Sequence, residues 1–380
     1  MQLSIIILNY NVRYFLELCV LSVQNAIQNI DAEIIVIDNN SRDDSCAMMK
    51  QRFPTVKLIE NKENSGFPKG NNIGVAAAQG EYICILNPDT VVAEDTFAKV
   101  LAFAKKRKEL GIVGVKLIDG TGNFLPESKR GIPTPFVAFT KITGLYKIFP
   151  NSFGRYYAQH LSENETGKVD ILVGAFMLMK RDLYNEIGGF DENCFMYSDD
   201  IDLSYMALKK GKSNYYFHQT SVIHYKGEST VNDGTYMKRF QEAMNFFYKK
   251  HFRVSFLFSV FMKMGIVFFS MVKKVQGKPK PKSRPEKYIL VSDDEVLREK
   301  FENKWQILVE RHDITKSFAE NGKTEIIFDQ NQLDFKTIIQ AFEANKNKNF
   351  TFKILPESSD FVIGSNSSFD RGEVLKIKDI

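Results

Sequence analysis

The sequence predicts an α/β protein in which helices flank a mostly parallel sheet. Continuous apolar runs alternate with segments whose apolar residues recur at helical spacing, the pattern of strand–helix–strand units. The composition, 44% hydrophobic and 26% charged, is ordinary for a globular protein and excludes a mostly disordered or polytopic membrane chain. At about 100–200 residues per domain, the 380 residues leave room for more than one domain.

The first elements are strands and helices in alternation. Leu3–Leu8 is a continuous apolar run typical of a buried parallel strand, and Arg13–Gln28 carries apolar residues at helical spacing. Because ligands of such sheets bind beyond the carboxyl ends of the strands, the polar residues that follow each strand are the first candidates for a site. The next elements are expected to be strands at 33–38, 56–60 and 81–86, with a helix at 71–79.

The middle of the chain continues the alternation. A short helix is expected at Arg181–Ile187, because two glycines follow it as a stop signal. The acidic stretch 197–203 opens a second helix that runs to Lys210. Strands are expected at Gly111–Ile118, Asp170–Lys180, Asn214–His218 and Ser221–Tyr225.

The basic residues are concentrated in one segment. Residues 238–287 contain 13 Lys and Arg against two acids, which gives them a charge of +11, whereas the whole chain carries +5. Such a segment indicates a membrane surface or a nucleic acid as partner. Within it, the apolar run Val254–Val272 is long enough to cross a bilayer, but lysines and serines around Lys263 form a polar stripe. We expect a helix that lies in the membrane interface; a true span and a helix packed on its own domain are the alternatives.

A Pro- and Lys-rich linker at 277–285 precedes a small second α/β unit. The sequence is divided into a first α/β domain at 1–235, a basic amphipathic segment and linker at 236–287, and a module of unknown role at 288–380. Strands of the module are expected at Lys287–Ser292, Thr324–Phe328, Phe350–Leu355 and Asp360–Gly364.

The cysteines indicate a reducing compartment. They are scattered, without metal-finger spacing or the density of a disulfide framework. No signal peptide is visible before the first strand, so we expect the catalytic part to face the cytoplasm. The four cysteines are Cys19, Cys46, Cys84 and Cys194.

Two aspartates end predicted strands. Asp38, with small polar neighbours, suits hydrogen bonds from a nucleobase or ribose, although an Asx turn that caps the next helix explains it equally well. Asp89, in Asn87-Pro88-Asp89, suits Mg²⁺ or Mn²⁺, which takes one or two protein carboxylates; a plain turn is the alternative. His224 ends a later strand and is a second candidate ligand if it meets Asp89 in space.

The acidic cluster Asp199, Asp200 and Asp202 is a candidate for proton transfer. Three like charges within four residues repel each other, so solvation, a metal or a raised pKa must compensate. One of them is suited to act as a general base. The alternative is that these acids stabilise the first turn of a helix through its dipole.

Five motifs, taken in order, resemble the family 2 glycosyltransferases, in particular the bacterial rhamnosyltransferase-like branch. The likeness covers about the first 235 residues. The stretches that carry it are SIIILNYN (4–11), IIVIDNNSRDDS (34–45), ENSGFPKGNNIGVAAAQGEYICILNPDT (63–90), VGAFMLMKRDLYNEIGGFDENCFMYSDDIDL (173–203) and IHYKGEST (223–230).

The resemblance implies a GT-A fold and a sugar transfer that inverts the anomeric carbon. It implies that Asp200 is the catalytic base, with Asp199 and Asp202 in support. It also implies that Asp89 holds a divalent cation, Mg²⁺ or Mn²⁺, and that His224 closes on the ion or the diphosphate. The nucleotide-binding residues that it implies are Asn9, Tyr10, Asn11, Asp38, Asn40, Asn64, Gly66, Asn71 and Asn87.

Two positions depart from the family pattern. The paired acids usual at the metal position read Asn87-Pro88-Asp89, which leaves Asp89 as the one strong ligand there. The acidic pair reads Asp199-Asp200 where Glu-Asp is common, and the shorter Asp199 changes the expected contacts with the acceptor.

The function that follows is an inverting, metal-assisted transferase at the inner face of a bacterial membrane. It would move a sugar, with rhamnose from dTDP-rhamnose favoured and UDP-sugars next, to a lipid-linked saccharide for surface polysaccharide. The basic segment would hold the enzyme peripherally on anionic lipid.

Three other functions compete with this one. A sugar nucleotidylyltransferase needs a Gly-rich loop after the first strand, where this chain has Asn9-Tyr10-Asn11-Val12. A non-catalytic nucleotide-sugar-binding or scaffold protein remains the alternative that predicts binding without turnover. A nucleic-acid partner is not expected, because the basic residues flank an apolar run.

Overall fold

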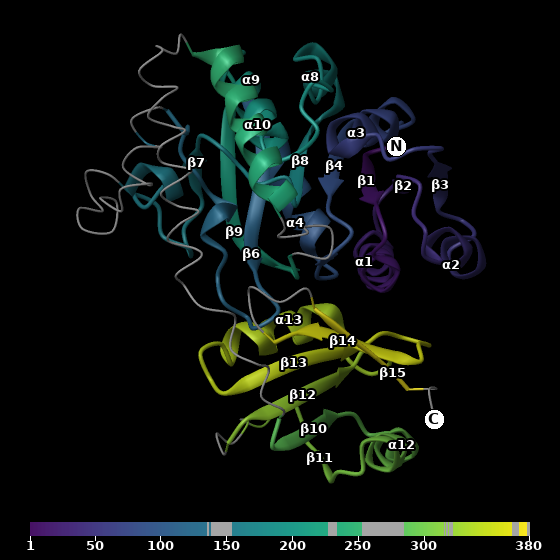
Figure 1. Ribbon diagram of the computed structural model, residues 1–380. Coiled ribbons are helices and arrows are strands. Elements are labelled where there is room, and N and C mark those ends of the chain that lie inside the picture. Colours follow the sequence, from purple (N-terminus) through teal and green to yellow (C-terminus); the bar gives the residue numbers. More distant parts are fainter. Residues whose placement is uncertain are drawn as a thin grey trace.

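The computed structural model contains two sheets, one in each of two α/β units that pack against each other (Figure 1). The larger sheet belongs to the first 226 residues, and the smaller one belongs to the C-terminal module. The structure describes residues 1–134, 137, 154–226, 234–252, 285–314, 316, 318, 322–366 and 372–377.

The larger sheet has nine described strands. Strands β1 to β4 run parallel to one another, and β8 is antiparallel to both of its neighbours. Their order is β3-β2-β1-β4-β8-β6-β9-β5, and β7 pairs with β9 outside this order. The strands are β1 (Leu3–Asn9), β2 (Ala32–Asp38), β3 (Lys57–Glu60), β4 (Tyr82–Leu86), β5 (Thr90–Val91), β6 (Leu110–Ile118), β7 (Gly167–Val169), β8 (Phe176–Lys180) and β9 (Ser213–His224).

Helices cover both faces of this sheet because its central strands are continuous apolar runs, which place apolar side chains on both faces. In β1, Ile5 and Ile7 join the core with α1, whereas Ile6 and Leu8 join the opposite core with α3, α8 and α9. The helices are α1 (Arg13–Ala26), α2 (Ser45–Arg52), α3 (Gly66–Ala76), α4 (Thr96–Lys105), α8 (Arg181–Glu186), α9 (Asp199–Lys209) and α10 (Gly234–His251), with short 3₁₀ turns η1 (Pro126–Ser128) and η2 (Gly154–Tyr157).

The smaller sheet has six described strands in the order β11-β10-β12-β13-β14-β15. The first four strands are parallel to one another, and β14 is antiparallel to both of its neighbours, β13 and β15. Helix α12 (Glu295–Trp305) covers one face, and α13 (Phe335–Ala344) covers the other. The strands are β10 (Lys287–Val291), β11 (Val309–Arg311), β12 (Thr324–Asp329), β13 (Phe350–Leu355), β14 (Phe361–Ser365) and β15 (Glu373–Lys376).

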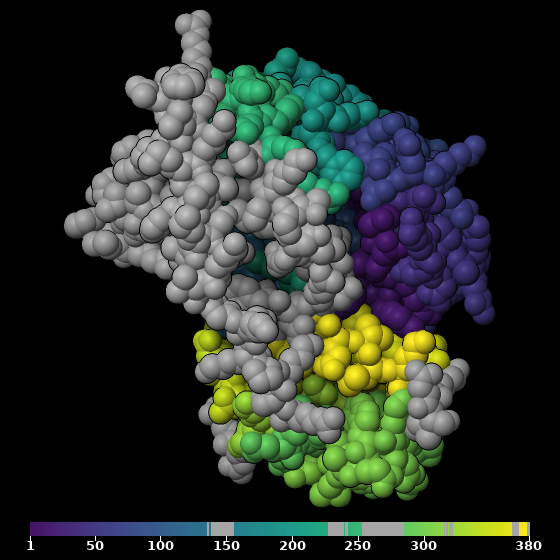
Figure 2. All heavy atoms as spheres, in the orientation of Figure 1, coloured from purple at the N-terminus to yellow at the C-terminus, as the bar shows by residue number. Residues whose placement is uncertain are grey.

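The C-terminal module shares its core with the larger sheet. One cluster of buried apolar side chains runs from α1 and α4 through α13 into the smaller sheet. The Tyr14 and Phe361 rings meet at 4.8 Å, and Glu94 accepts hydrogen bonds from the backbone N–H groups of Phe335 and Lys336 at 2.7 and 2.9 Å. Figure 2 shows the surface of the module, in green and yellow, directly against the purple N-terminal residues.

The predicted α/β class is confirmed, and several boundaries differ. The expected strands at 214–218 and 221–225 are one strand, β9, in which a register shift against β6 separates Phe217 from Ser221. The strand expected from Asp170 begins only at Phe176, because the preceding residues turn toward α9. Helix α3 starts at Gly66, five residues before the expected start at Asn71. Strands β5, β7, β11 and β15 and helices α4 and α10 were not predicted.

Helix α10 packs on the larger domain. Met244, Phe247 and Tyr248 of α10 form an apolar cluster with Ile171 and Ile201. Within the described ranges, no helix combines the length and the apolar composition that crossing a bilayer requires. The apolar run at 254–272, for which we expect an interfacial helix, lies outside the described residues.

Candidate active site

The carboxyl ends of β1, β2 and β4 bring the first candidate residues to one edge of the larger sheet. Asn9 and Asp38 are partners in the β1–β2 register, and both are buried. The side-chain amide of Asn9 donates to Asp38 Oδ1 at 2.7 Å and to Ser41 Oγ at 3.1 Å. The other carboxylate oxygen of Asp38 accepts from the backbone N–H of Ser41 at 2.8 Å. The bond from Ser41 is local, so Asp38 fixes the turn that follows β2 and also holds Asn9.

The loop after β1 is tied to the loop after β2. Asn11 and Asn40 both have positive φ values, 57° and 64°, which asparagine tolerates better than most residues. The side chain of Asn11 accepts from the backbone N–H of Arg42 at 2.7 Å. Tyr10 lies between these anchors with 36% of its surface exposed, so its ring is available to a ligand at the rim.

Asn39 connects this edge to the start of α3. Its amide donates to Asn64 Oδ1 at 3.2 Å and to the Gly66 carbonyl at 3.1 Å. Gly66 has a φ of +80°, and a Cβ there would lie 2.8 Å from the Phe195 ring, so a larger residue does not fit. Asn71 is fully buried; its amide donates to the Phe67 carbonyl, and its Oδ1 has no partner among the described residues.

Asp89 and His224 meet, as the ligand hypothesis requires. Strand β5 pairs with β9 so that Thr90 lies opposite His224, and His224 Nε2 is 3.4 Å from Asp89 Oδ1. The Asn87 amide is also 3.4 Å from His224 Nε2. Both Asp89 and His224 are buried, at 5% and 7% exposure.

This group fits a divalent cation. Asp89 Oδ1, Asn87 Oδ1 and His224 Nδ1 are buried and make no hydrogen bond to any described residue. Buried polar atoms without partners are costly, and a hard cation would satisfy the two oxygens. Among the described residues, no group of three or more His, Cys, Asp or Glu is arranged to hold a metal ion.

Asp199 and Asp200 begin α9 and are both buried, at 7% and 8% exposure. Burial, followed by the neighbouring charge of Asp200, raises the pKa of Asp199 to about 7. Asp200 Oδ2 accepts from Arg130 Nη2 at 2.5 Å and from the Gly174 backbone N–H at 3.1 Å. The two aspartates therefore have different surroundings although they are neighbours in sequence.

The backbone at Gly174 and Ala175 joins the two candidate groups. Gly174 donates to Asp200, and the Ala175 carbonyl accepts from the backbone N–H of Asn87 at 3.1 Å. A Cβ on Gly174 would lie 3.5 Å from Asp200 Cβ and 3.6 Å from the Phe67 ring of α3. Gly174 and Ala175 thus bring Asp200, Asn87 and the start of α3 close together at the sheet edge.

Asp202 lies apart from Asp199 and Asp200. Its Oδ1 is 2.5 Å from His251 Nε2, and its Oδ2 accepts from Lys250 Nζ at 2.8 Å. Both partners are on α10, so Asp202 attaches α10 to α9. If Asp202 supports catalysis as predicted, it would do so by holding α9 against α10.

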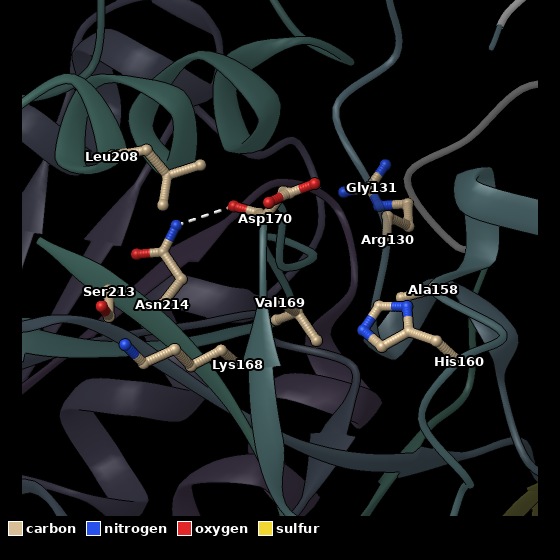
Figure 3. A pocket seen from close by; sticks show the side chains of 10 residues that line it. All are labelled: Arg130, Gly131, Ala158, His160, Lys168, Val169, Asp170, Leu208, Ser213 and Asn214. Atoms are coloured by element: carbon tan, nitrogen blue, oxygen red, sulfur yellow. Dashed lines mark hydrogen bonds between the residues drawn. The ribbon is translucent and has the colours of Figure 1, made fainter.

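A cavity of about 390 Å³ lies beside Arg130, the residue that contacts Asp200. Figure 3 shows the residues that line it, Arg130 and Asp170 among them. The cavity contains none of the residues that the sequence assigns to the site. Sequence reasoning did not single out Arg130, and it assigned no role to Asn39. Asn39 sits beside Asp38 in a motif that pointed to it, whereas Arg130 has no motif of its own around it.

The comparisons with known proteins agree with this geometry. The profile of the family described as "Glycosyl transferase family 2" matches residues 4–188. Those residues match that family, which bears out the resemblance to family 2 glycosyl transferases, and the relatives below bear out the likeness to the rhamnosyltransferase-like branch. The strand order bears out the α/β class of fold with a mostly parallel sheet.

The relatives include two bacterial rhamnosyltransferases. The chain is 27% identical to N-acetylglucosaminyl-diphospho-decaprenol L-rhamnosyltransferase of Mycobacterium tuberculosis over 212 residues, 53% of this chain and 68% of that protein. It is 25% identical to rhamnosyltransferase WbbL of Escherichia coli over 217 residues, 53% of this chain and 78% of that protein. A solved mannosyltransferase of Pyrobaculum calidifontis, in complex with GDP-Man and Mn²⁺, is 20% identical with a TM-score of 0.47; the match covers 67% of this chain and 65% of that one.

Proposed function

We propose that this glycosyltransferase inverts the anomeric carbon of a sugar that it takes from a nucleoside diphosphate donor. One observation carries the proposal: Asp89 with Asn87 and His224, and Asp200 with Asp199, are two buried polar groups joined through Gly174 and Ala175. Inversion needs a leaving-group site and a base in one place, and it needs no covalent nucleophile.

The nucleotide would bind along the ends of β1 and β2 and the start of α3. Asp38, Asn9, Tyr10, Asn11 and Asn40 would contact the base and ribose, and the N-terminal turn of α3, with Asn64, Gly66 and Asn71, would form the neighbouring wall. Asn87 would contact the nucleotide beside the ion. The polar side chains at this edge and the positive end of α3 suit an anionic nucleotide.

Asp89 and His224 would hold Mg²⁺ or Mn²⁺. A bound ion would supply charge neutralisation for the departing diphosphate. Asp200 would take the proton of the acceptor hydroxyl through Oδ1, which none of the hydrogen bonds between described residues uses. Asp199 would support it as a neighbouring carboxyl, and Asp202 would keep α9 in place through α10.

The relatives support a donor and an acceptor class. Two of them are rhamnosyltransferases, so we propose dTDP-rhamnose as the first donor to test and UDP-sugars as the second. The mycobacterial relative is named for a decaprenol-linked sugar, and another relative, 32% identical over 126 residues, is a minor teichoic acid biosynthesis protein of Bacillus subtilis. We therefore propose a lipid-linked saccharide acceptor and a role in surface polysaccharide.

We also propose the division into residues 1–235, 236–287 and 288–380, and a peripheral location at the inner membrane face. The charge of +11 over 238–287 supports attraction to anionic lipid. The test is sedimentation with anionic vesicles of the chain and of a variant whose lysines at 273, 274, 278, 280 and 282 are changed to Gln. Equal pelleting of the two would refute lipid attraction by these charges.

The test of the transfer itself uses a donor panel of dTDP-rhamnose, UDP-sugars and GDP-sugars with polyprenyl-diphosphate-linked saccharides. Mass spectrometry detects the acceptor with one added sugar, and NMR of the new linkage detects inversion. Transfer from one donor, lost in Asp200→Asn, is the expected result. Donor binding without transfer under any of these conditions would favour the non-catalytic scaffold.

A further inference from the structure

Arg130 is a buried cation in contact with the candidate base. It follows η1 on the loop after β6, and its backbone forms two hydrogen bonds with Ile171, each of 2.9 Å. These bonds fix the direction in which the side chain leaves the backbone. Only 9% of the residue is exposed, and it lines the cavity of Figure 3.

The guanidinium holds one oxygen of Asp200 and leaves the other free. Arg130 Nη2 is 2.5 Å from Asp200 Oδ2 and donates also to the Leu172 carbonyl at 3.0 Å. Gly174 adds a second donor to the same Oδ2. Two donors on one oxygen define the carboxylate plane, so the direction of Oδ1 is set before any substrate binds.

The charge of Arg130 matters as much as its geometry. Two adjacent buried carboxylates tend to share a proton, because burial and mutual repulsion both disfavour a second negative charge. This tendency shows at Asp199, where burial and Asp200 raise the pKa to about 7 while the Arg130 charge opposes the rise. Among the described residues, Cys194 is near Asp199 and Tyr156 is near Arg130. His160, Lys168 and Asp170 line the cavity together with Arg130.

We propose that Arg130 is a positioning residue for sugar transfer, which fixes Oδ2 of Asp200 and places a positive charge beside the two aspartates, so that Oδ1 of Asp200 can accept the proton of the acceptor hydroxyl. The inference rests on the proposed function for its catalytic meaning. Arg130 touches the base and not the reacting atoms. Its effect should therefore be in kcat and in the pH dependence, and not in the affinity for the nucleotide.

The experiment compares Arg130→Gln, Arg130→Lys and Lys168→Gln with the unchanged protein. Lys168 lines the same cavity, and no described contact joins it to Asp200. For Arg130→Gln we expect kcat at pH 7 to fall by about 10-fold or more and the acid limb of the pH–rate profile to move up by about one unit or more. Arg130→Lys keeps the charge and should keep the acid limb, and Lys168→Gln should match the unchanged protein.

A readout that does not need turnover separates this inference from the proposed function. Carboxyl ¹³C NMR with labelled aspartate, assigned by comparison with Asp199→Asn and Asp200→Asn, follows protonation of the pair. In Arg130→Gln the pair should take up its proton at higher pH by about one unit or more. If the unchanged protein transfers no sugar but this shift appears, the proposed function fails and the electrostatic role of Arg130 stands.

An unchanged titration of the pair in folded Arg130→Gln overturns the inference. So does an active Arg130→Gln whose kcat and pH profile match those of Lys168→Gln. If Arg130→Gln does not fold, Arg130→Lys decides: because it keeps the charge but not the planar fork, normal kcat in that variant contradicts the fixing of Oδ2.

Discussion

At the scale of single residues, two chemically identical side chains differ because their neighbours differ. Asp199 and Asp200 are adjacent and equally buried, but only Asp200 is paired with a cation. The sequence was enough to nominate both from their spacing and motif. It could not indicate Arg130, which lies 70 residues away and reaches Asp200 only because its backbone bridges Ile171.

The first prediction at this scale concerns Asp200, the proposed base, and the effect of its removal on kcat. Asp200→Asn keeps the size and the contact with Gly174 but cannot accept a proton, so kcat should fall by about 100-fold or more. Nucleotide affinity measured by calorimetry should stay within about twofold, because Asp200 is not among the nucleotide contacts. Asp182→Asn, at an exposed position of α8, is the matched control. Unchanged kcat in Asp200→Asn would remove Asp200 as the base.

The raised pKa of Asp199 gives a second prediction. A carboxyl with a folded pKa near 7, above its usual 3.8, binds more protons in the folded state between these two values. Its contribution to stability is therefore present at low pH and is lost as pH rises toward 7. Asp199→Asn lacks this loss, so its unfolding free energy relative to the unchanged protein should rise between pH 5 and 8. A difference that is flat with pH in urea unfolding would contradict the raised pKa.

At the scale of elements, α10 is bound to the helix that carries the acidic cluster. The attachment has a polar part, Asp202 with Lys250 and His251, and an apolar part around Phe247. Sequence reasoning placed Asp202 with the catalytic acids because it shares a helix face with Asp199. The structure shows both of its oxygens engaged by α10, which no local pattern could indicate, since those partners lie 48 and 49 residues away.

Asp202→Asn tests this attachment. The change removes the negative charge that holds Lys250 and His251, while Lys250 keeps its ion pair with Asp191, so we expect a loss of about 0.5–1.5 kcal/mol in unfolding free energy. Amide hydrogen exchange should become faster in α10 than in α3, which has no contact with Asp202. Asp182→Asn again serves as control, because an exposed acid contributes little. Unchanged exchange in α10 would show that the apolar cluster alone holds the helix.

At the scale of the whole molecule, two α/β units are joined by one core. The sequence predicted both units from their strand patterns and placed a linker between them. It did not predict their contact, because the residues that meet are far apart in the chain: Glu94 and Phe335 are separated by 241 positions. The same contact brings Gly120, in the loop after β6, against Ser365 and Tyr225, and Tyr225 follows the candidate ligand His224.

Glu94→Ala tests the joint between the units. Glu94 accepts the first two N–H groups of α13 and thereby caps this helix from the other unit. Loss of a helix cap costs about 0.5–2 kcal/mol, so the unfolding transition in urea should shift by that amount. Glu81→Ala, which removes an exposed ion pair of 3.9 Å, should have almost no effect. Equal effects of the two variants would mean that the cap contributes nothing.

The central claim is that the sheet edge at Asn9, Asp38 and Asp89 binds a nucleoside diphosphate together with a divalent cation. The most direct measurement is calorimetry with uridine, thymidine and guanosine diphosphates, with and without Mg²⁺ or Mn²⁺. It is made on the unchanged protein, on Asp89→Ala and on the control Asp182→Ala. We predict ion-dependent binding of one nucleotide, which Asp89→Ala loses and Asp182→Ala retains. The claim would be contradicted by nucleotide binding whose affinity depends neither on the ion nor on Asp89. It would also be contradicted if none of the three nucleotides bound.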